Sequence, residues 1–149
     1  VKKEDVKKVS DLWESMGSKV KIMSISEHDQ ILSLTSHLPH VIAYNIVKTS
    51  MTNGEKLKND IIRYSAGGLR DFTRIAASDP IMWKDIFIDN SELIIHAIDN
   101  FVKNLTEFKN AIKEKDSKKL LDIFEKSKEF REAIIKAGQD TDKPDFGRK

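Results

Sequence analysis

Apolar residues recur at intervals of three and four along most of the chain, the spacing that places them on one face of an α-helix. The pattern is clearest in residues 90–114, in steps of four and three: Ile94, Ile98, Phe101, Leu105, Phe108 and Ile112. This a/d seam is expected to lie in a groove between other helices. Such a helix would be about 37 Å long, which exceeds a compact domain of this size. We therefore expect the seam to meet a second chain in a two-fold dimer, with a monomeric antiparallel bundle as the alternative.

The first 25 residues show a different pattern. A helical stripe over residues 3–16 ends at Gly17, and residues 20–23 alternate like a short strand. One helix and one strand cannot bury a sheet face unaided, so such a pair normally belongs to a larger parallel α/β unit. We interpret residues 1–25 as the end of a preceding domain.

A long helix is predicted over residues 26–51, with Ser26 as its N-cap and Asp29 three residues on. One face is apolar, and a second carries polar groups: Ser33, Ser36, His37, His40 and Tyr44. Pro39 interrupts this helix because its ring has no N–H to offer the carbonyl of Thr35, so we expect a kink there.

Further helices are predicted for the rest of the chain. One covers residues 55–64, and residues 65–68 are expected to form a turn in which Gly67 and Gly68 adopt backbone angles closed to other residues. The pair Asp79 and Pro80 starts another helix, with Trp83 one turn in. A final helix begins at Asp116 and ends at Gly138, and its inward side chains are expected to be Leu120, Ile123, Phe124, Phe130 and Ile134. The expected fold class is therefore all-α.

Composition narrows the class of protein. The 149 residues suffice for one domain, and 39% hydrophobic with 34% charged residues describes a soluble, helix-rich chain. We expect no membrane span and no signal peptide, since no apolar run approaches roughly 18 residues. The chain has no cysteine, which fits a cytoplasmic location. The net charge of +2 comes from interspersed residues and argues against a nucleic-acid partner. Because the first residue is Val1, the chain is expected to begin inside a longer one.

Several chemistries fit the sequence poorly. His37 and His40 could share a metal ion with Asp71, but their spacing matches no familiar zinc site and the proline between them disturbs the helix, so we expect no metal. A nucleophile triad fits less well still, because Ser36 and His37 point about 100° apart on a helix and no strand–turn–helix elbow surrounds the serine. Gly67 and Gly68 have neither a third glycine nor a preceding strand, so they do not form a phosphate loop.

An anion-binding pocket lined by helices remains. Arg74 is its best candidate ligand, because a guanidinium offers a planar fork that matches a carboxylate. Asp71, one turn earlier, would hold Arg74 or orient a histidine. The alternative is a surface ion pair worth about 0.2–0.5 kcal/mol. His37 and His40 are equally compatible with ordinary partly buried histidines, and Trp83 with a core residue. Spacing alone does not choose between these interpretations.

The two dense stretches together resemble the C-terminal region of prephenate dehydrogenases and of the related arogenate and cyclohexadienyl dehydrogenases. The resemblance is carried by His-Asp at 28–29, Ser-His-Leu-Pro-His at 36–40, Gly-Gly at 67–68, Asp-Phe-Thr-Arg-Ile-Ala at 71–76 and Ser-Asp-Pro-Ile-Met-Trp at 78–83. It extends over residues 6–138. In that family a Rossmann nucleotide-binding domain precedes an all-helical dimerisation domain with long intertwined helices. The resemblance therefore assigns residues 1–25 to a Rossmann remnant, 26–138 to the helical substrate-binding and dimerisation domain, and 139–149 to a polar tail.

The resemblance implies an oxidoreductase of tyrosine biosynthesis, which carries out NAD- or NADP-dependent oxidative decarboxylation of prephenate or arogenate. Arg74 would grip a substrate carboxylate, His40 would hydrogen-bond the substrate, and Asp71 would orient or gate it. Gly67 would let the backbone approach the substrate. The remaining expected site residues are Trp83, entering the pocket of the partner subunit, and Ser36 and His37, near the nicotinamide.

One departure from the family is large. Its glycine-rich dinucleotide loop and its general-base histidine belong to the Rossmann domain and are missing from these residues, so no catalytic residue is assigned here. NAD or NADP would be bound mainly by that missing domain. Alone, the chain is expected to dimerise and to bind substrate weakly without turning it over. Two alternatives remain open, a structural helical dimer and a regulatory module that binds an aromatic acid such as tyrosine.

Overall fold

The computed structural model describes residues 2–52 and 54–139, and within them it contains helices and no strand. The elements are α1 (Lys3–Ser15), α2 (Ile25–Leu32), a π-helical turn η1 (Ser33–His37), α3 (Leu38–Met51), α4 (Gly54–Arg63), α5 (Gly67–Thr73), a 3-10 turn η2 (Arg74–Ala77), α6 (Pro80–Asp89), α7 (Ser91–Lys113) and α8 (Ser117–Lys136). The expected all-α class is confirmed. The expected tail at 139–149 lies almost wholly outside the described residues.

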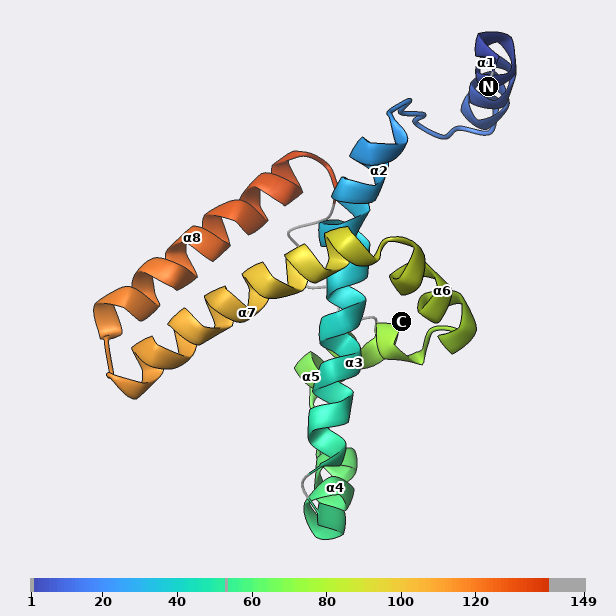
Figure 1. Cartoon of the computed structure of the whole chain (residues 1–149). Coiled ribbons are helices and arrows are strands. Elements are labelled where there is room, and N and C mark those ends of the chain that lie inside the picture. The colour runs from blue at the N-terminus through green and yellow to red at the C-terminus, as the bar shows by residue number, and fades with distance from the viewer. Residues whose placement is uncertain (1, 53, 140–149) are drawn as a thin grey trace.

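A central column formed by α2, η1 and α3 organises the molecule (Figure 1). The hairpin of α7 and α8 projects from one side of this column, and α7 packs against η1 and α3. The helix α5 and the turn η2 pack against α3 and lead into α6, which lies on the other side of the column and contacts α7. The helix α4 lies against the far end of α3, and α1 stands apart beyond α2. The elements that carry the predicted site residues thus surround the middle of the column.

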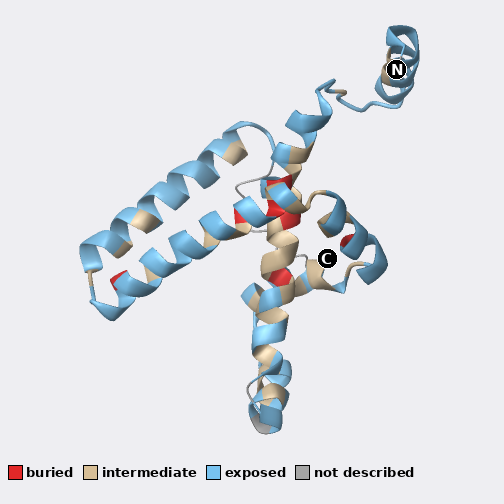
Figure 2. Ribbon diagram, in the orientation of Figure 1, coloured by how far each residue is buried: buried red, intermediate tan, exposed pale blue. Residues whose placement is uncertain are grey.

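The chain buries little apolar surface by itself. It exposes 12722 Å², whereas a compact monomer of this length exposes about 7,700 Å². Buried positions gather where α7 and α6 approach the column, with a further one near the far end of α7 (Figure 2). The buried hydrophobic residues are Ala43, Trp83, Ile94, Ala97 and Ala111. Three of these five side chains are alanines, so this core is small.

The strand predicted at residues 20–23 is wrong, because these residues are irregular in the structure. A strand needs a neighbour to satisfy its backbone N–H and C=O groups, and the described residues supply none. The preceding helix α1 is confirmed and ends as expected: Gly17 has a φ of 89°, and its N–H donates to the carbonyl of Glu14 over 2.9 Å.

The first helix of the column begins earlier than predicted. Ser24, rather than Ser26, is the N-cap of α2: its Oγ accepts from the backbone N–H of Glu27 over 3.2 Å, and Glu27 Oε2 accepts from the backbone N–H of Ser24 over 2.8 Å. Both halves of a capping box are present, so two N–H groups that the helix leaves unpaired are satisfied together. The glutamate side chain is long enough to reach back across the first turn.

The turn predicted over residues 65–68 is only partly correct, because its two glycines are helical. Both glycines lie in the first turn of α5, and neither has a positive φ. The break falls earlier, at residues 65 and 66, which are irregular. Ala66 is extended, with a ψ of 170°, and provides the N-cap position of the helix.

The last three helices begin where the sequence predicts. Asp79 caps α6 by accepting from the N–H groups of Ile81 and Met82, and Asp116 caps α8 by accepting from that of Lys119. The inward orientation expected for α8 is only partly correct. Phe124 contacts Phe108 of α7 with ring centroids 5.9 Å apart, yet it is 54% exposed, and Phe130 is 72% exposed. Within the described ranges, no third helix covers the outer face of the hairpin.

Candidate functional site

The helix is interrupted just before Pro39 by a π-helical turn, as expected, while the kink expected there stays a prediction. The backbone N–H of Leu38 donates to the carbonyl of Ser33, five residues earlier instead of four. A π-turn of this kind absorbs the register change that a proline imposes, because Pro39 has no N–H to donate. Its first and last residues, Ser33 and His37, are both buried against neighbouring elements.

His37 is held at the junction of three elements. It closes η1, its side chain is buried, and its Nδ1 lies 3.2 Å from the Nδ2 of Asn90, the residue that joins α6 to α7. The same Nδ2 donates to the backbone carbonyl of Asp29 in α2 over 3.0 Å. Burial lowers the pKa of His37, although the Asp29 carboxylate opposes the shift. A neutral imidazole is therefore favoured at this position.

His40 lies one turn further along the column and is half-buried. Its ring stacks on the indole of Trp83, with centroids 3.5 Å apart and planes inclined by 22°. Its Nδ1 is 2.9 Å from the backbone carbonyl of Ser36. Since a carbonyl only accepts, Nδ1 carries the hydrogen. The Nε2 of the neutral ring is then an acceptor, able to receive a hydrogen bond from a hydroxyl.

Trp83 is the centre of this aromatic cluster. The indole is 6% exposed and contacts three rings. It stacks on the ring of His40 and meets the ring of His37 edge-on, with centroids 6.1 Å apart. The centroid of the Phe87 ring lies 5.5 Å away. Its Nε1 is buried with no hydrogen-bond partner among the described residues. In the single chain the indole covers the chain's own histidines, and the expected entry of Trp83 into the partner subunit's pocket stays a prediction.

The structure brings together some predicted site residues and leaves others apart. His37, His40 and Trp83 are in direct contact, and Ser36 is half-buried in the same π-turn. Gly67 begins α5 and is also half-buried. Arg74 begins η2, which packs against α3, but its side chain is exposed, as is that of Asp71. Within the described residues Asp71 and Arg74 form no ion pair with each other or with either histidine.

Two hollows flank α3 elsewhere. One, of about 330 Å³, lies between α3, α4 and α5, with Lys58 and Arg70 in its lining. The other is an apolar groove of about 470 Å³ between α3 and α7, lined by Val41, Ile42, Asn45, Ile46, Thr49, Ile98, Phe101, Val102 and Leu105. Neither hollow is lined by His37, His40 or Arg74.

Two further observations concern metals and membranes. In the described part of the chain no three histidine, aspartate or glutamate side chains gather where one ion could bind them. None of the described helices combines the length and the apolar character needed to cross a membrane.

Asn90 is a residue of this site that the sequence pattern did not reveal. Its amide reaches Asp29 and His37, which lie 61 and 53 residues away along the chain. The local signal was its place just before a helical pattern, where an asparagine is typical of a cap. In the structure its side chain makes no cap hydrogen bond with α7. Its role becomes visible only when α7 is packed against the column.

An all-helical chain with an uncovered apolar groove and a histidine–tryptophan cluster has the features of a helical dimerisation module. A family model described as "Prephenate dehydrogenase, dimerization domain" matches residues 24–126. The chain belongs to this family.

Relatives of known function agree with the family. The cyclohexadienyl dehydrogenase of Zymomonas mobilis subsp. mobilis is 40% identical over 126 residues, which cover 85% of this chain and 43% of that protein. The prephenate dehydrogenase of Bacillus subtilis is 31% identical over 132 residues, which cover 89% of this chain and 35% of that protein. The chain therefore spans less than half of the length of these relatives.

Solved structures show the same fold. The prephenate dehydrogenase of Aquifex aeolicus in complex with hydroxyphenyl propionate and NAD+ superposes with a TM-score of 0.82 and 38% identity, over 90% of this chain and 46% of that one. The Synechocystis arogenate dehydrogenase superposes with a TM-score of 0.77 at 16% identity, over 89% of this chain and 48% of that one. At this identity it supports the fold alone.

Proposed function

We propose that the chain is the substrate-binding and dimerisation region of a prephenate-type dehydrogenase. The whole enzyme would carry out NAD- or NADP-dependent oxidative decarboxylation of prephenate or arogenate in tyrosine biosynthesis, in the cytoplasm. The observation that carries this proposal is the family match over residues 24–126, which include the histidine–tryptophan cluster, α5, η2 and all of α7. The 40% identity to a cyclohexadienyl dehydrogenase supports it.

A homodimer is supported by the exposed surface. The chain exposes roughly 5,000 Å² more than a compact monomer of its length would. Obligate homodimers bury roughly 2,000–5,000 Å² in total, so a second copy can account for much of this excess. The groove between α3 and α7 has no charged residue in its lining, which suits an apolar helix of the partner.

Substrate binding would combine Arg74 of η2 with the cluster of His40 and Trp83. Arg74 would pair with a substrate carboxylate once the partner excludes water from its guanidinium, because a buried charge-assisted pair is stronger than an exposed one. Asp71, one turn before it, would orient that guanidinium, and Gly67 would leave room for the substrate. The free Nε2 of His40 would accept a hydrogen bond from a substrate hydroxyl, and the stacked Trp83 would hold the ring in place.

The cofactor is not assigned to the described residues. They contain no strand, so they offer no strand-to-helix glycine turn on which a dinucleotide pyrophosphate could lie. NAD or NADP would be held mainly by a Rossmann domain of the whole enzyme, with Ser36 and His37 on its side of the cleft. The chain's own residues would bind and orient the substrate, and the nicotinamide held by that domain would supply the hydride acceptor.

Calorimetric titration tests this function. Prephenate, arogenate, hydroxyphenyl propionate and tyrosine are each titrated into the chain and into the Arg74→Ala variant. Binding of prephenate, arogenate or hydroxyphenyl propionate that the variant loses supports the proposal. Binding of tyrosine alone would favour a regulatory module, and binding of none of the four would favour a purely structural dimer.

A further inference from the structure

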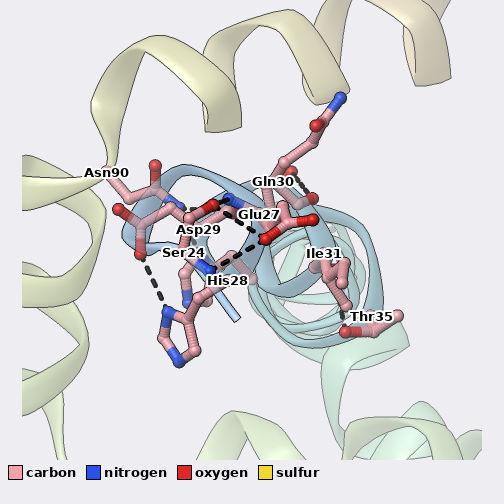
Figure 3. Close-up of polar contacts among 10 residues, drawn as sticks. Ser24, Glu27, His28, Asp29, Gln30, Ile31, Thr35 and Asn90 are labelled. Atoms are coloured by element: carbon pink, nitrogen blue, oxygen red, sulfur yellow. Dashed lines mark hydrogen bonds and ion pairs between the residues drawn. The ribbon is translucent and has the colours of Figure 1, made fainter. Parts of the chain in front are cut away.

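The side-chain amide of Asn90 has an orientation set by a backbone group. Its Nδ2 lies 3.0 Å from the carbonyl oxygen of Asp29, and Figure 3 shows Asn90 beside Asp29, where the start of α7 meets α2. A carbonyl oxygen only accepts hydrogen bonds. The flipped amide would place Oδ1 against this oxygen, two acceptors in contact, so the NH2 group must face Asp29.

That orientation determines the tautomer of His37. The NH2 group has two hydrogens, and Nδ2 is also 3.2 Å from His37 Nδ1. The second hydrogen therefore points at Nδ1, which must hold a lone pair to accept it. The hydrogen of the neutral ring is then on Nε2. The backbone carbonyl thus orients the amide, and the amide in turn selects the tautomer of the imidazole.

The other ring nitrogen of His37 is not fully enclosed, although the residue is only 7% exposed. Among the described residues, the fully buried side-chain nitrogen or oxygen without a hydrogen-bond partner is Trp83 Nε1, and His37 Nε2 does not belong to that class. Since Nε2 also lacks a hydrogen-bond partner among these residues, it is not fully enclosed. An N–H group on Nε2 is therefore available to a bound molecule.

Neighbouring charges do not supply a competing partner for Nδ1. The Asp29 carboxylate in α2 is engaged by His28, whose Nδ1 lies 2.9 Å from Asp29 Oδ1. His40 in α3 has its own Nδ1 on the carbonyl of Ser36. The junction of α6 and α7 contributes the neutral Asn90. The group that faces Nδ1 is thus a neutral donor.

We propose that Asn90 is a positioning residue that fixes His37 as the Nε2–H tautomer, so that His37 presents a hydrogen-bond donor while the neighbouring His40 presents an acceptor. The ligand atom at His37 is then an acceptor oxygen, such as that of a carbonyl or carboxylate, and the atom at His40 is the hydrogen of a hydroxyl. The identity of the molecule that supplies these atoms rests on the proposed function, whereas the tautomer of His37 is independent of it.

Nitrogen-15 NMR of the full chain labelled at histidine tests the assignment. A ring nitrogen with a hydrogen and one with a lone pair differ widely in chemical shift, so the spectrum reads the tautomer of each ring. The four histidine signals are assigned by single substitutions to glutamine. His37 is expected to show a protonated Nε2 and an unprotonated Nδ1 near neutral pH. In Asn90→Asp the carboxylate draws a hydrogen onto Nδ1, and the pKa of His37 is expected to rise by about one to three units.

The chain offers a matched control. Asn100 and His96 form a similar pair on α7, with Nδ2 and Nδ1 3.3 Å apart, but both are exposed. Asn100→Asp should leave the signals of His37 unchanged. Should Asn90→Asp fail to fold, as judged by circular dichroism, Asn90→Ala serves instead and is expected to give a mixture of tautomers at His37.

Two results would overturn the assignment: an Nδ1-protonated His37 in the unsubstituted chain, or a His37 tautomer that persists in both Asn90 variants. Failure of the proposed function is read separately. If the tautomer is as assigned but none of prephenate, arogenate and hydroxyphenyl propionate binds, the positioning role of Asn90 stands and the substrate proposal fails.

Discussion

The centre of the column and the α7–α8 hairpin differ in how far one chain completes them. At the centre, His37, His40 and Trp83 contact one another and are covered by α3, α6 and the start of α7. Along the hairpin, the a/d seam is regular in sequence, yet Leu105 and Ile112 are 52% and 54% exposed.

This difference in burial distinguishes residues that pack within one chain from apolar residues that are left for a partner. Residues at the centre are explained by contacts within the chain, so substitutions there should change the stability or ligand binding of each protomer. The outer part of the α7 seam is apolar and exposed at Leu105 and Ile112, although Ile94 at its start is buried, so we expect a partner outside the chain to cover it. Substitutions there should change association before they change the protomer.

The largest expected effect is at the centre. Trp83→Ala removes a 6% exposed indole and should lower the free energy of unfolding by about 3–5 kcal/mol. Trp83→Phe keeps one aromatic ring, and what it removes is the smaller ring of the indole with an N–H that has no partner among the described residues, so it should cost less. Urea unfolding followed by circular dichroism measures both. Equal losses in the two variants would show that ring packing is not what Trp83 contributes.

The next effect is on the hairpin. Leu105→Glu places a charge in the groove between α3 and α7 and should weaken dimerisation by about 3 kcal/mol, or about a hundredfold. Lys103→Glu, on the same helix but outside that groove, is the control. Sedimentation velocity over a range of concentrations gives both dissociation constants. A dimer of unchanged affinity in Leu105→Glu would remove the groove from the interface.

The next prediction concerns Arg74, which would bind substrate beside the centre of the column once the partner subunit covers it. Arg74→Ala should weaken prephenate or hydroxyphenyl propionate binding by about 2 kcal/mol, or about thirtyfold, without dissociating the dimer. Arg63→Ala, whose guanidinium lies 5.5 Å from the centroid of the Tyr64 ring, is the matched control and should bind normally. Calorimetry compares them. If both variants bind the ligand with equal affinity, Arg74 is a surface cation that does not contact the ligand.

A smaller effect is expected at the start of the column. Ser24→Ala removes the capping box and should cost about 1 kcal/mol of stability. Ser26→Ala, the cap that the sequence suggested, should be nearly neutral. Thermal unfolding of the two variants distinguishes them. The reverse order would place the helix start at the predicted residue.

The smallest effect is a pH dependence from His37. Burial lowers its pKa below the ordinary value of 6.5, so as the pH falls below about 6.5 the unfolded chain binds a proton that the folded chain does not. Stability should therefore fall on acidification through the window between 6.5 and the lowered pKa. His37→Asn should flatten this dependence, while His96→Asn should keep it. Urea midpoints measured across this range test the sign.

Local features of the fold could be predicted from the sequence. Periodicity located α7, and the Asp79 and Pro80 pair located the start of α6, because these depend on residues within one or two turns. Pro39 likewise indicated the break in the column. The cap at Ser24 was missed by two residues, since both serines precede an acidic residue at the third position.

Features that depend on packing could not be predicted. Gly67 and Gly68 suggested a turn, but a glycine permits a positive φ without requiring it. The contact of Asn90 with His37 joins residues 53 positions apart and appears only after α7 meets the column. The site was predicted as a set of residue types. His37, His40 and Trp83 do meet, whereas Arg74 is exposed and its predicted part in the site stays a prediction.

Sedimentation equilibrium of the unsubstituted chain tests most directly whether a second copy completes the fold. We predict a single species with the mass of two chains down to low concentration, with the helix content of the structure. A chain that sediments as a monomer while keeping that helix content would contradict this prediction, because the apolar surface of α3 and α7 would then be stable in water without a partner.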